Sequence, residues 1–117
     1  MIMNCAQDLE SFKLAHDLTL EVYELTRNFA DASKQKLGVK IRDRAEDINA
    51  NLLAGSQLNS PELYREAVNK SKILVGQLEY YLLLAKDLDY LEEKQHAELQ
   101  QRINQLSRIL SGMKKAL

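Results

Sequence analysis

The chain is poor in residues that interrupt helices and in residues that cross-link small folds. Its 117 residues include four glycines, one proline, no tryptophan and a single cysteine. Because Gly and Pro are the least favourable residues inside a helix, their scarcity permits long uninterrupted helices. The lone cysteine, Cys5, excludes an intrachain disulfide, and this cysteine usage fits a reduced, intracellular setting.

The chain also lacks a strong charge of either sign and a long apolar run. Its formal net charge of −1 gives no basic excess of the kind that marks nucleic-acid-binding domains. The N-terminal residues show no basic region followed by a long apolar stretch, so no secretory signal is expected. Ten of the thirteen residues in Ile73–Ala85 are apolar, but a bilayer span needs about 20. We therefore expect a cytoplasmic protein without a membrane partner.

Apolar residues instead recur at helical spacing in four blocks. The predicted helices cover residues 7–30, 35–55, 60–88 and 91–116, in a single domain of residues 1–117. Ser60-Pro61-Glu62 is a good start signal, because Ser can cap a helix, Pro suits its first turn and Glu complements its dipole. Short connections make successive helices antiparallel. The expected fold is all-α, an up-down-up-down antiparallel four-helix bundle.

The third predicted helix carries more apolar residues than one bundle should cover. A bundle helix needs one apolar stripe, about 100° wide or somewhat more. Residues 60–88 add two flanks to that stripe: Val68, Val75 and Leu82 on one side, and Ile73, Tyr80 and Leu84 on the other. Large side chains left in water forfeit about 1.5–3 kcal/mol each, so we predict that these six residues form a homo-oligomer interface. A broad helix in an asymmetric monomer is the alternative.

Four segments, in order along the chain, match a known pattern. DLESFKLAHDLTLEVYELTRNF (Asp8–Phe29) looks like D-L-x-V-W-x-x-A…L-x-L-x-V-Y-x-L-T-x-x-F, and IRDRAEDINANLLAG (Ile41–Gly55) is similar to I-R-R-A-A-x-S-I-P-x-N-I-A-E-G. Gln77–Leu91 looks like E-L-E-x-Q-L-x-L-A-x-x-L-G-Y-L, and Leu106–Leu117 is similar to I-x-K-M-L-x-G-L-I-K-S-L. Together they resemble the four-helix-bundle family encoded in intervening sequences of bacterial 23S rRNA genes. The departures are Phe12 for Trp, Ala30 and Asn49 for Pro, Ala54 for Glu and Asp89 for Gly.

The resemblance implies a bundle that assembles as a ring-like homo-oligomer, typically a pentamer, with no established activity. The accessory variability determinants of diversity-generating retroelements are relatives of this family, and that branch implies a basic ring that binds a reverse transcriptase and its template RNA. We therefore expect a non-enzymatic accessory factor for RNA, a reverse transcriptase or both, with no cofactor and no small-molecule substrate. The alternative is an oligomeric protein-interaction scaffold without a nucleic-acid role, which the balanced charge favours.

Two basic sets are the candidate nucleic-acid-binding residues. The first is Lys34, Lys36, Lys40, Arg42 and Arg44, which with the acid Asp43 gives five positive charges and one negative charge, a net +4. Cations at a helix start oppose its dipole, so local stability does not explain them. The alternative is compensation by the nearby acids Asp87, Asp89, Glu92 and Glu93. The second set is Arg102, Arg108, Lys114 and Lys115, which also suits the C-terminal end of a helix dipole.

The remaining candidates are aromatic or potentially metal-binding. We expect Tyr64, Tyr80 and Tyr90 at the surface or at an interface, and we expect Tyr23, Tyr81 and Phe12 in the core. Glu93 and His96 form one E-x-x-H, the ligand spacing of di-iron bundles, but such sites need this motif on two helices and two further carboxylates. No catalytic residue and no metal site is therefore predicted.

Overall fold

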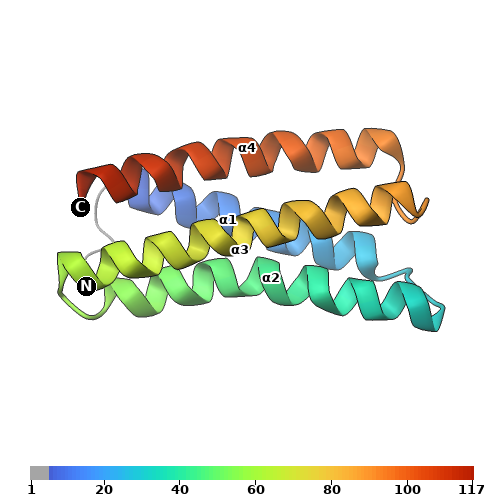
Figure 1. The fold of residues 1–117 in the computed structure, drawn as a ribbon, viewed down its shortest axis with the longest axis horizontal. Helices are drawn as coiled ribbons and strands as arrows, with labels where there is room; N and C mark the ends of the chain where they lie inside the picture. The colour runs from blue at the N-terminus through green and yellow to red at the C-terminus, as the bar shows by residue number, and fades with distance from the viewer. Residues whose placement is uncertain (1–5) are drawn as a thin grey trace.

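The computed structural model describes residues 6–117, which form four α-helices and no strand. The helices are α1 (Ala6–Thr26), α2 (Ala32–Ser56), α3 (Pro61–Asp87) and α4 (Glu93–Ala116). They lie lengthwise side by side in a body of 44 × 23 × 18 Å (Figure 1). At 1.5 Å per residue the 27 residues of α3 span about 40 Å, so single helices account for the long axis. Cys5 lies outside the described residues.

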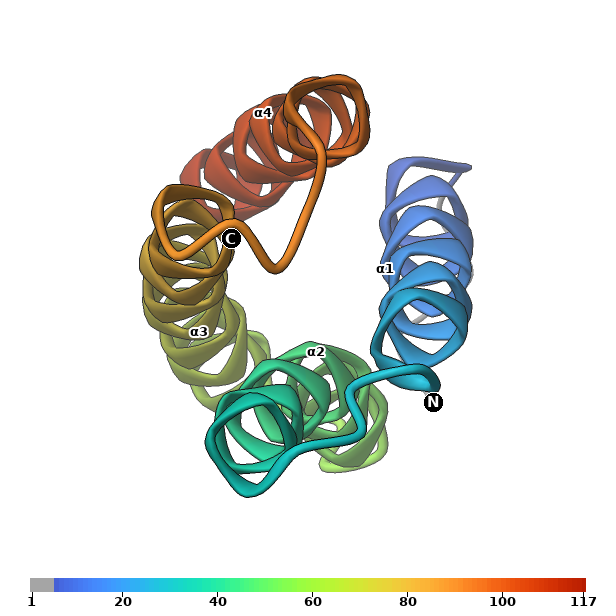
Figure 2. The same ribbon diagram turned by 90° about the vertical axis from the view of Figure 1, so that its right-hand side faces the viewer.

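The helices enclose one core, with each helix packed against two others (Figure 2). α1 and α3 each contact α2 and α4, and in Figure 1 the chain colour advances in opposite directions along successive helices. The core is aliphatic: Leu18, Ile48, Leu78 and Leu106 are at most 1% exposed. Full burial of such side chains is worth about 1.5–3 kcal/mol each, which makes this core the main source of stability.

Side-chain caps fix where the helices begin. The Asp31 carboxylate accepts a hydrogen bond from the Lys34 backbone N–H (2.9 Å), so α2 begins at Ala32 rather than near residue 35. Ser60 caps α3 in the same way, as the sequence predicts, by accepting from the Leu63 N–H. α1 ends at Thr26 rather than near residue 30, because the chain turns there and the Phe29 N–H bonds the Thr26 carbonyl. The predicted boundaries at this first connection are therefore wrong by a few residues on each side.

Small residues bring α2 and α3 close together. A Cβ added at Gly55 would lie 2.4 Å from the Cβ of Ala67, far inside van der Waals contact, so only glycine fits there. Further along the same pair, the buried Ser71 hydroxyl donates to the Ile48 carbonyl (3.0 Å). The ring of Tyr64 lies beside Gly55 and is fully buried. The prediction that Tyr64 lies at the surface or at an interface is therefore wrong, because a single chain buries it completely.

The two apolar flanks of α3 differ in burial. Val68, Val75 and Leu82 are 0%, 3% and 2% exposed and belong to the core of a single chain. A single chain already covers them. The prediction that this flank belongs to a homo-oligomer interface is therefore wrong. On the other flank, Ile73 and Tyr80 are 55% and 58% exposed, and Leu84 is half-buried. The core thus reaches further round α3 on one side only.

Candidate nucleic-acid interface

The first basic set lies along the N-terminal half of α2, and none of its five cations forms an ion pair within residues 6–117. Lys36 and Lys40 are exposed, whereas the other three cations are half-buried. Capping of this helix by Asp31 satisfies one N–H, but the later cations receive no carboxylate. The positive charge of this segment is therefore not neutralised by direct contact.

Tyrosine rings support four of these cations. The Nζ of Lys34 lies 5.3 Å from the ring centroid of Tyr90, which follows α3. The guanidinium of Arg42 lies 5.6 Å from the ring of Tyr23 and donates to the Thr26 hydroxyl (2.8 Å). Cation–π contacts of this kind contribute about 0.5–1 kcal/mol at exposed sites. Each of these four cations thus has an aromatic neighbour, and none of the four residues is fully buried.

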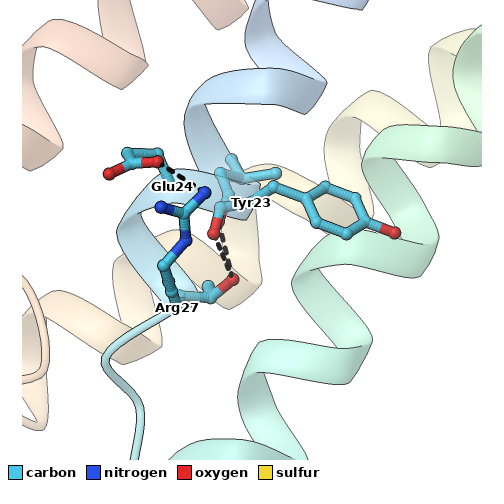
Figure 3. A network of polar contacts seen from close by, with 5 residues as sticks. Tyr23, Glu24 and Arg27 are labelled. Atoms are coloured by element: carbon cyan, nitrogen blue, oxygen red, sulfur yellow. Dashed lines mark hydrogen bonds and ion pairs between the residues drawn. The ribbon is translucent and has the colours of Figure 1, made fainter.

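Tyr23 is 43% exposed, so the expectation that it belongs to the core is wrong. Figure 3 shows its ring pointing away from the Glu24–Arg27 pair and toward α2. That ion pair (2.9 Å) lies on the exposed side of α1 and leaves the Tyr23 ring to Arg42. Tyr23 thus contacts a cation of α2 and does not pack in the core.

Lys40 and Arg44, one helical turn apart, share the ring of Tyr81 on α3. Their charged groups lie 5.7 Å and 5.6 Å from its centroid. Arg44 also donates from Nε to the Gln77 side-chain oxygen (2.7 Å), which ties α2 to α3. Tyr81 is half-buried, although the sequence placed it in the core. α3 therefore supports Lys40 and Arg44, whereas α1 supports Arg42.

A shallow groove of about 300 Å³ runs between the start of α2 and the end of α3. Lys36 and Lys40 line one wall, and Leu84 and Leu88 line the other. The groove combines exposed aliphatic surface with two lysines that have no acidic partner. Such a surface suits an anionic ligand that also offers apolar area.

The acids proposed to compensate this charge lie at the same end of the molecule. Asp87, Asp89, Glu92 and Glu93 line a hollow of about 750 Å³ around the turn between α3 and α4. Asp87 pairs with Lys86 (3.8 Å), not with α2. Direct pairing between these acids and the α2 cations does not occur in residues 6–117, so any compensation acts only at longer range.

The second basic set is dispersed and partly structural. Arg102 pairs with Glu21 of α1 (3.0 Å), and the Lys114 Nζ donates to Asn69 of α3 (2.7 Å). Arg108 and Lys115 are exposed. Two of the four cations thus tie α4 to its neighbours, and the set does not form one continuous patch.

Comparison with protein families gives a match that covers most of each of the four helices. The model of the 23S rRNA-intervening sequence protein family matches residues 7–112, almost the whole chain. The chain belongs to that family. No curated protein and no solved structure matches it. The assignment agrees with the four-helix fold and with the resemblance found in the sequence.

Within residues 6–117, no group of three His, Cys, Asp or Glu side chains is arranged to hold a metal, and no helix has the length and apolar content to cross a membrane. Burial raises the pKa of the Asp8 carboxyl, which lies in the first turn of α1, far along the chain from the α2 cations. The α2 cations that lie over tyrosine rings are the feature most suited to ligand binding.

Proposed function

We propose that this intervening-sequence family member is a non-enzymatic RNA-binding protein, an accessory factor of a cytoplasmic ribonucleoprotein. Its phosphate contacts come from the α2 cation row, defined as Lys34, Lys36, Lys40, Arg42 and Arg44. One observation carries the proposal: this row has no ion pair in residues 6–117, and four of its members lie over tyrosine rings.

The arrangement favours a polyanion for two physical reasons. A phosphate that approaches the row does not have to displace a carboxylate, so little interaction energy is lost on binding. The tyrosines and Gln77 also restrict the side chains before binding, which lowers the entropy cost of ordering them. The overall charge of −1 does not oppose this, because screening at physiological salt confines the effect of distant charges to about 8 Å.

Filter binding to a structured RNA across a salt series tests the proposal. Each phosphate contact should contribute about 0.7–0.9 to the slope of log affinity against log salt, so a row of five predicts a slope of magnitude about 3.5–4.5. A protein with no affinity at low salt, or with affinity that salt does not change, would refute it. In the retroelement version a reverse transcriptase should co-purify together with its RNA.

A second candidate function is an oligomeric protein-interaction scaffold, which the exposed flank of α3 favours. In this version Ile73, Tyr80 and Leu84 face another copy in a ring-like homo-oligomer of up-down-up-down bundles, pentameric as the family resemblance implies. Tyr80→Asp should then reduce the mass in light scattering from that of a ring to that of one chain. Equal masses for variant and parent, both that of a single chain, would remove this candidate.

A further inference from the structure

Resting on the proposed RNA binding, we propose that the face shared by α2 and α3 is a single-strand site. Lys36, Lys40 and Arg44 contact successive phosphates, and Tyr80 stacks on an unpaired base. The ligand is a short single-stranded polynucleotide, and the ring of Tyr80 is the residue that selects it over a duplex.

Tyr80 is placed for this role by its exposure and by its neighbour. It is 58% exposed, the most exposed large apolar or aromatic side chain among residues 8–117. Its ring centroid lies 6.1 Å from that of Tyr81, at an interplanar angle of 56°. Tyr81 in turn carries the charged groups of Lys40 and Arg44. An accessible ring therefore lies one aromatic side chain away from two cations.

The spacing of three cations on α2 suits contact with successive phosphates of a polynucleotide. Lys36, Lys40 and Arg44 are each four residues apart, which puts them on one face of α2 at steps of about 6 Å. The straight row runs beside α3, because Lys40 and Arg44 both reach Tyr81 and Arg44 bonds Gln77. An extended backbone along this row would have its bases beside the outer surface of α3, where Tyr80 lies.

Acids limit the length of the site. Asp47 follows Arg44 by one helical turn on α2, and Asp87 follows Tyr80 by two turns on the same face of α3. Both are exposed, and both repel phosphate. The face therefore accommodates a few nucleotides, not a long strand.

Base accessibility decides between single strand and duplex. In a duplex each base is stacked and paired, and the deep, narrow major groove of A-form RNA is closed to side chains. An unpaired base offers a free π-face, and stacking on an aromatic side chain requires no particular sequence. Tyr80 gains a contact only with the single strand, whereas the cations interact with both forms.

The absence of tryptophan from the chain allows a direct test. Tyr80→Trp introduces a sole tryptophan, whose fluorescence should be quenched when an oligoadenylate of about 12 nucleotides stacks on it. Ile73→Trp is the matched control, because Ile73 lies two turns earlier on the same face and is 55% exposed. Its fluorescence should change little. Equal quenching at both positions, or none at position 80, overturns the stacking role.

Affinity for the same oligoadenylate provides the second measurement. Tyr80→Ala should weaken binding about fivefold to a hundredfold, whereas Tyr80→Phe and Ile73→Ala should bind as the parent does. A hairpin duplex should bind parent and Tyr80→Ala equally well. Oligodeoxyadenylate is included because the contacts described do not depend on the 2′-hydroxyl, and it should show the same dependence on Tyr80.

The outcomes separate this inference from the function on which it rests. One outcome is RNA binding that depends on salt, does not change in Tyr80→Ala and is tighter for a duplex. It would support the α2 row as an RNA site and overturn the single-strand site. Binding weakened about 10- to 100-fold when Lys36, Lys40 and Arg44 become Gln, together with the weakening expected for Tyr80→Ala, supports both. If Tyr80→Ala changes the mass in light scattering but not the affinity for the oligoadenylate, Tyr80 contacts a second copy of the chain. That result would overturn the inference.

Discussion

The two flanks of α3 have nearly the same composition but opposite surroundings. On one, Val68, Val75 and Leu82 are buried inside a single chain. On the other, Ile73 and Tyr80 are exposed, and the ring of Tyr80 lies 6.1 Å from that of Tyr81, which contacts two cations of α2. The cations differ in the same way: Lys114 on α4 is bonded to Asn69 of α3, whereas Lys36 has no ion pair in residues 6–117.

This contrast shows that apolar content alone does not identify an interface. The buried flank is part of the core because two neighbouring helices approach α3 there closely enough to exclude water. The exposed flank combines apolar area with positive charge that direct contacts leave free. Only the exposed flank is available to a ligand, and the predictions below compare the two.

Introducing a charge on each flank should give the largest difference. Leu82→Asp places a carboxylate in the core without a partner and should cost about 4 kcal/mol or more, most of the stability of a small domain. Tyr80→Asp changes an exposed site and should stay within about 0.5 kcal/mol of the parent as a monomer. Urea denaturation followed by circular dichroism measures both. A loss for Leu82→Asp no larger than that for Tyr80→Asp would show that the buried flank is open to water.

Removing positive charge should affect RNA binding differently in the two basic sets. Replacing Lys36, Lys40 and Arg44 by Gln should lower the salt slope of RNA binding by about 2 and weaken binding at low salt about 10- to 100-fold. The matched control replaces Arg108, Lys114 and Lys115 by Gln and removes the same charge. It should leave the affinity within a few-fold of the parent. Equal losses in both variants would mean that net charge, not the α2 row, controls binding.

Truncating one aliphatic side chain on each flank should give a smaller contrast. Val75→Ala removes two buried methyl groups and should destabilise the fold by about 1–2.5 kcal/mol. Ile73→Ala, two residues away on the exposed side, should change stability by no more than about 0.5 kcal/mol. Thermal denaturation at several protein concentrations gives both values. A large, concentration-dependent loss for Ile73→Ala would instead point to a partner on that side.

The two glycines Gly55 and Gly76 should respond with opposite signs. A Cβ at Gly76 would meet nothing within 4 Å, so Gly76→Ala should stabilise α3 by about 0.5–1 kcal/mol. Gly55→Ala would collide with Ala67 and should destabilise by about 1–3 kcal/mol. The free energies of unfolding from urea titration decide the signs. Destabilisation by Gly76→Ala would indicate that another chain packs closely there.

The sequence predicts the local features of this fold well. Helical periodicity identifies four helices and no strands, and Ser60-Pro61 marks the start of α3 because capping depends on adjacent residues alone. Asp31 is the same kind of signal, and its preference for the N-cap position could have placed the start of α2 correctly. The family assignment is likewise present in the sequence and agrees with the family model.

The site could be predicted only in part, because its decisive contacts are long-range. Spacing alone puts Lys36, Lys40 and Arg44 on one face of α2. It does not reveal that Tyr81, thirty-seven residues after Arg44, supports two cations, or that Tyr23 supports Arg42. The errors at Tyr64 and at Val68 have the same origin, since periodicity gives a residue's angle on its helix but not how far the neighbouring helices reach.

Two like charges converge on the single ring of Tyr81, and this has a consequence for the free protein. Cations one turn apart on a helix repel each other by a few tenths of a kcal/mol, and the ring holds both in that unfavourable proximity. A bound anion converts the repulsion into attraction and stabilises only the folded chain. Added sulfate should therefore raise the melting temperature of the parent more than that of a variant with Gln at positions 40 and 44, since exclusion of sulfate from the protein surface stabilises both alike. The difference between the two makes heat resistance itself a gauge of occupancy.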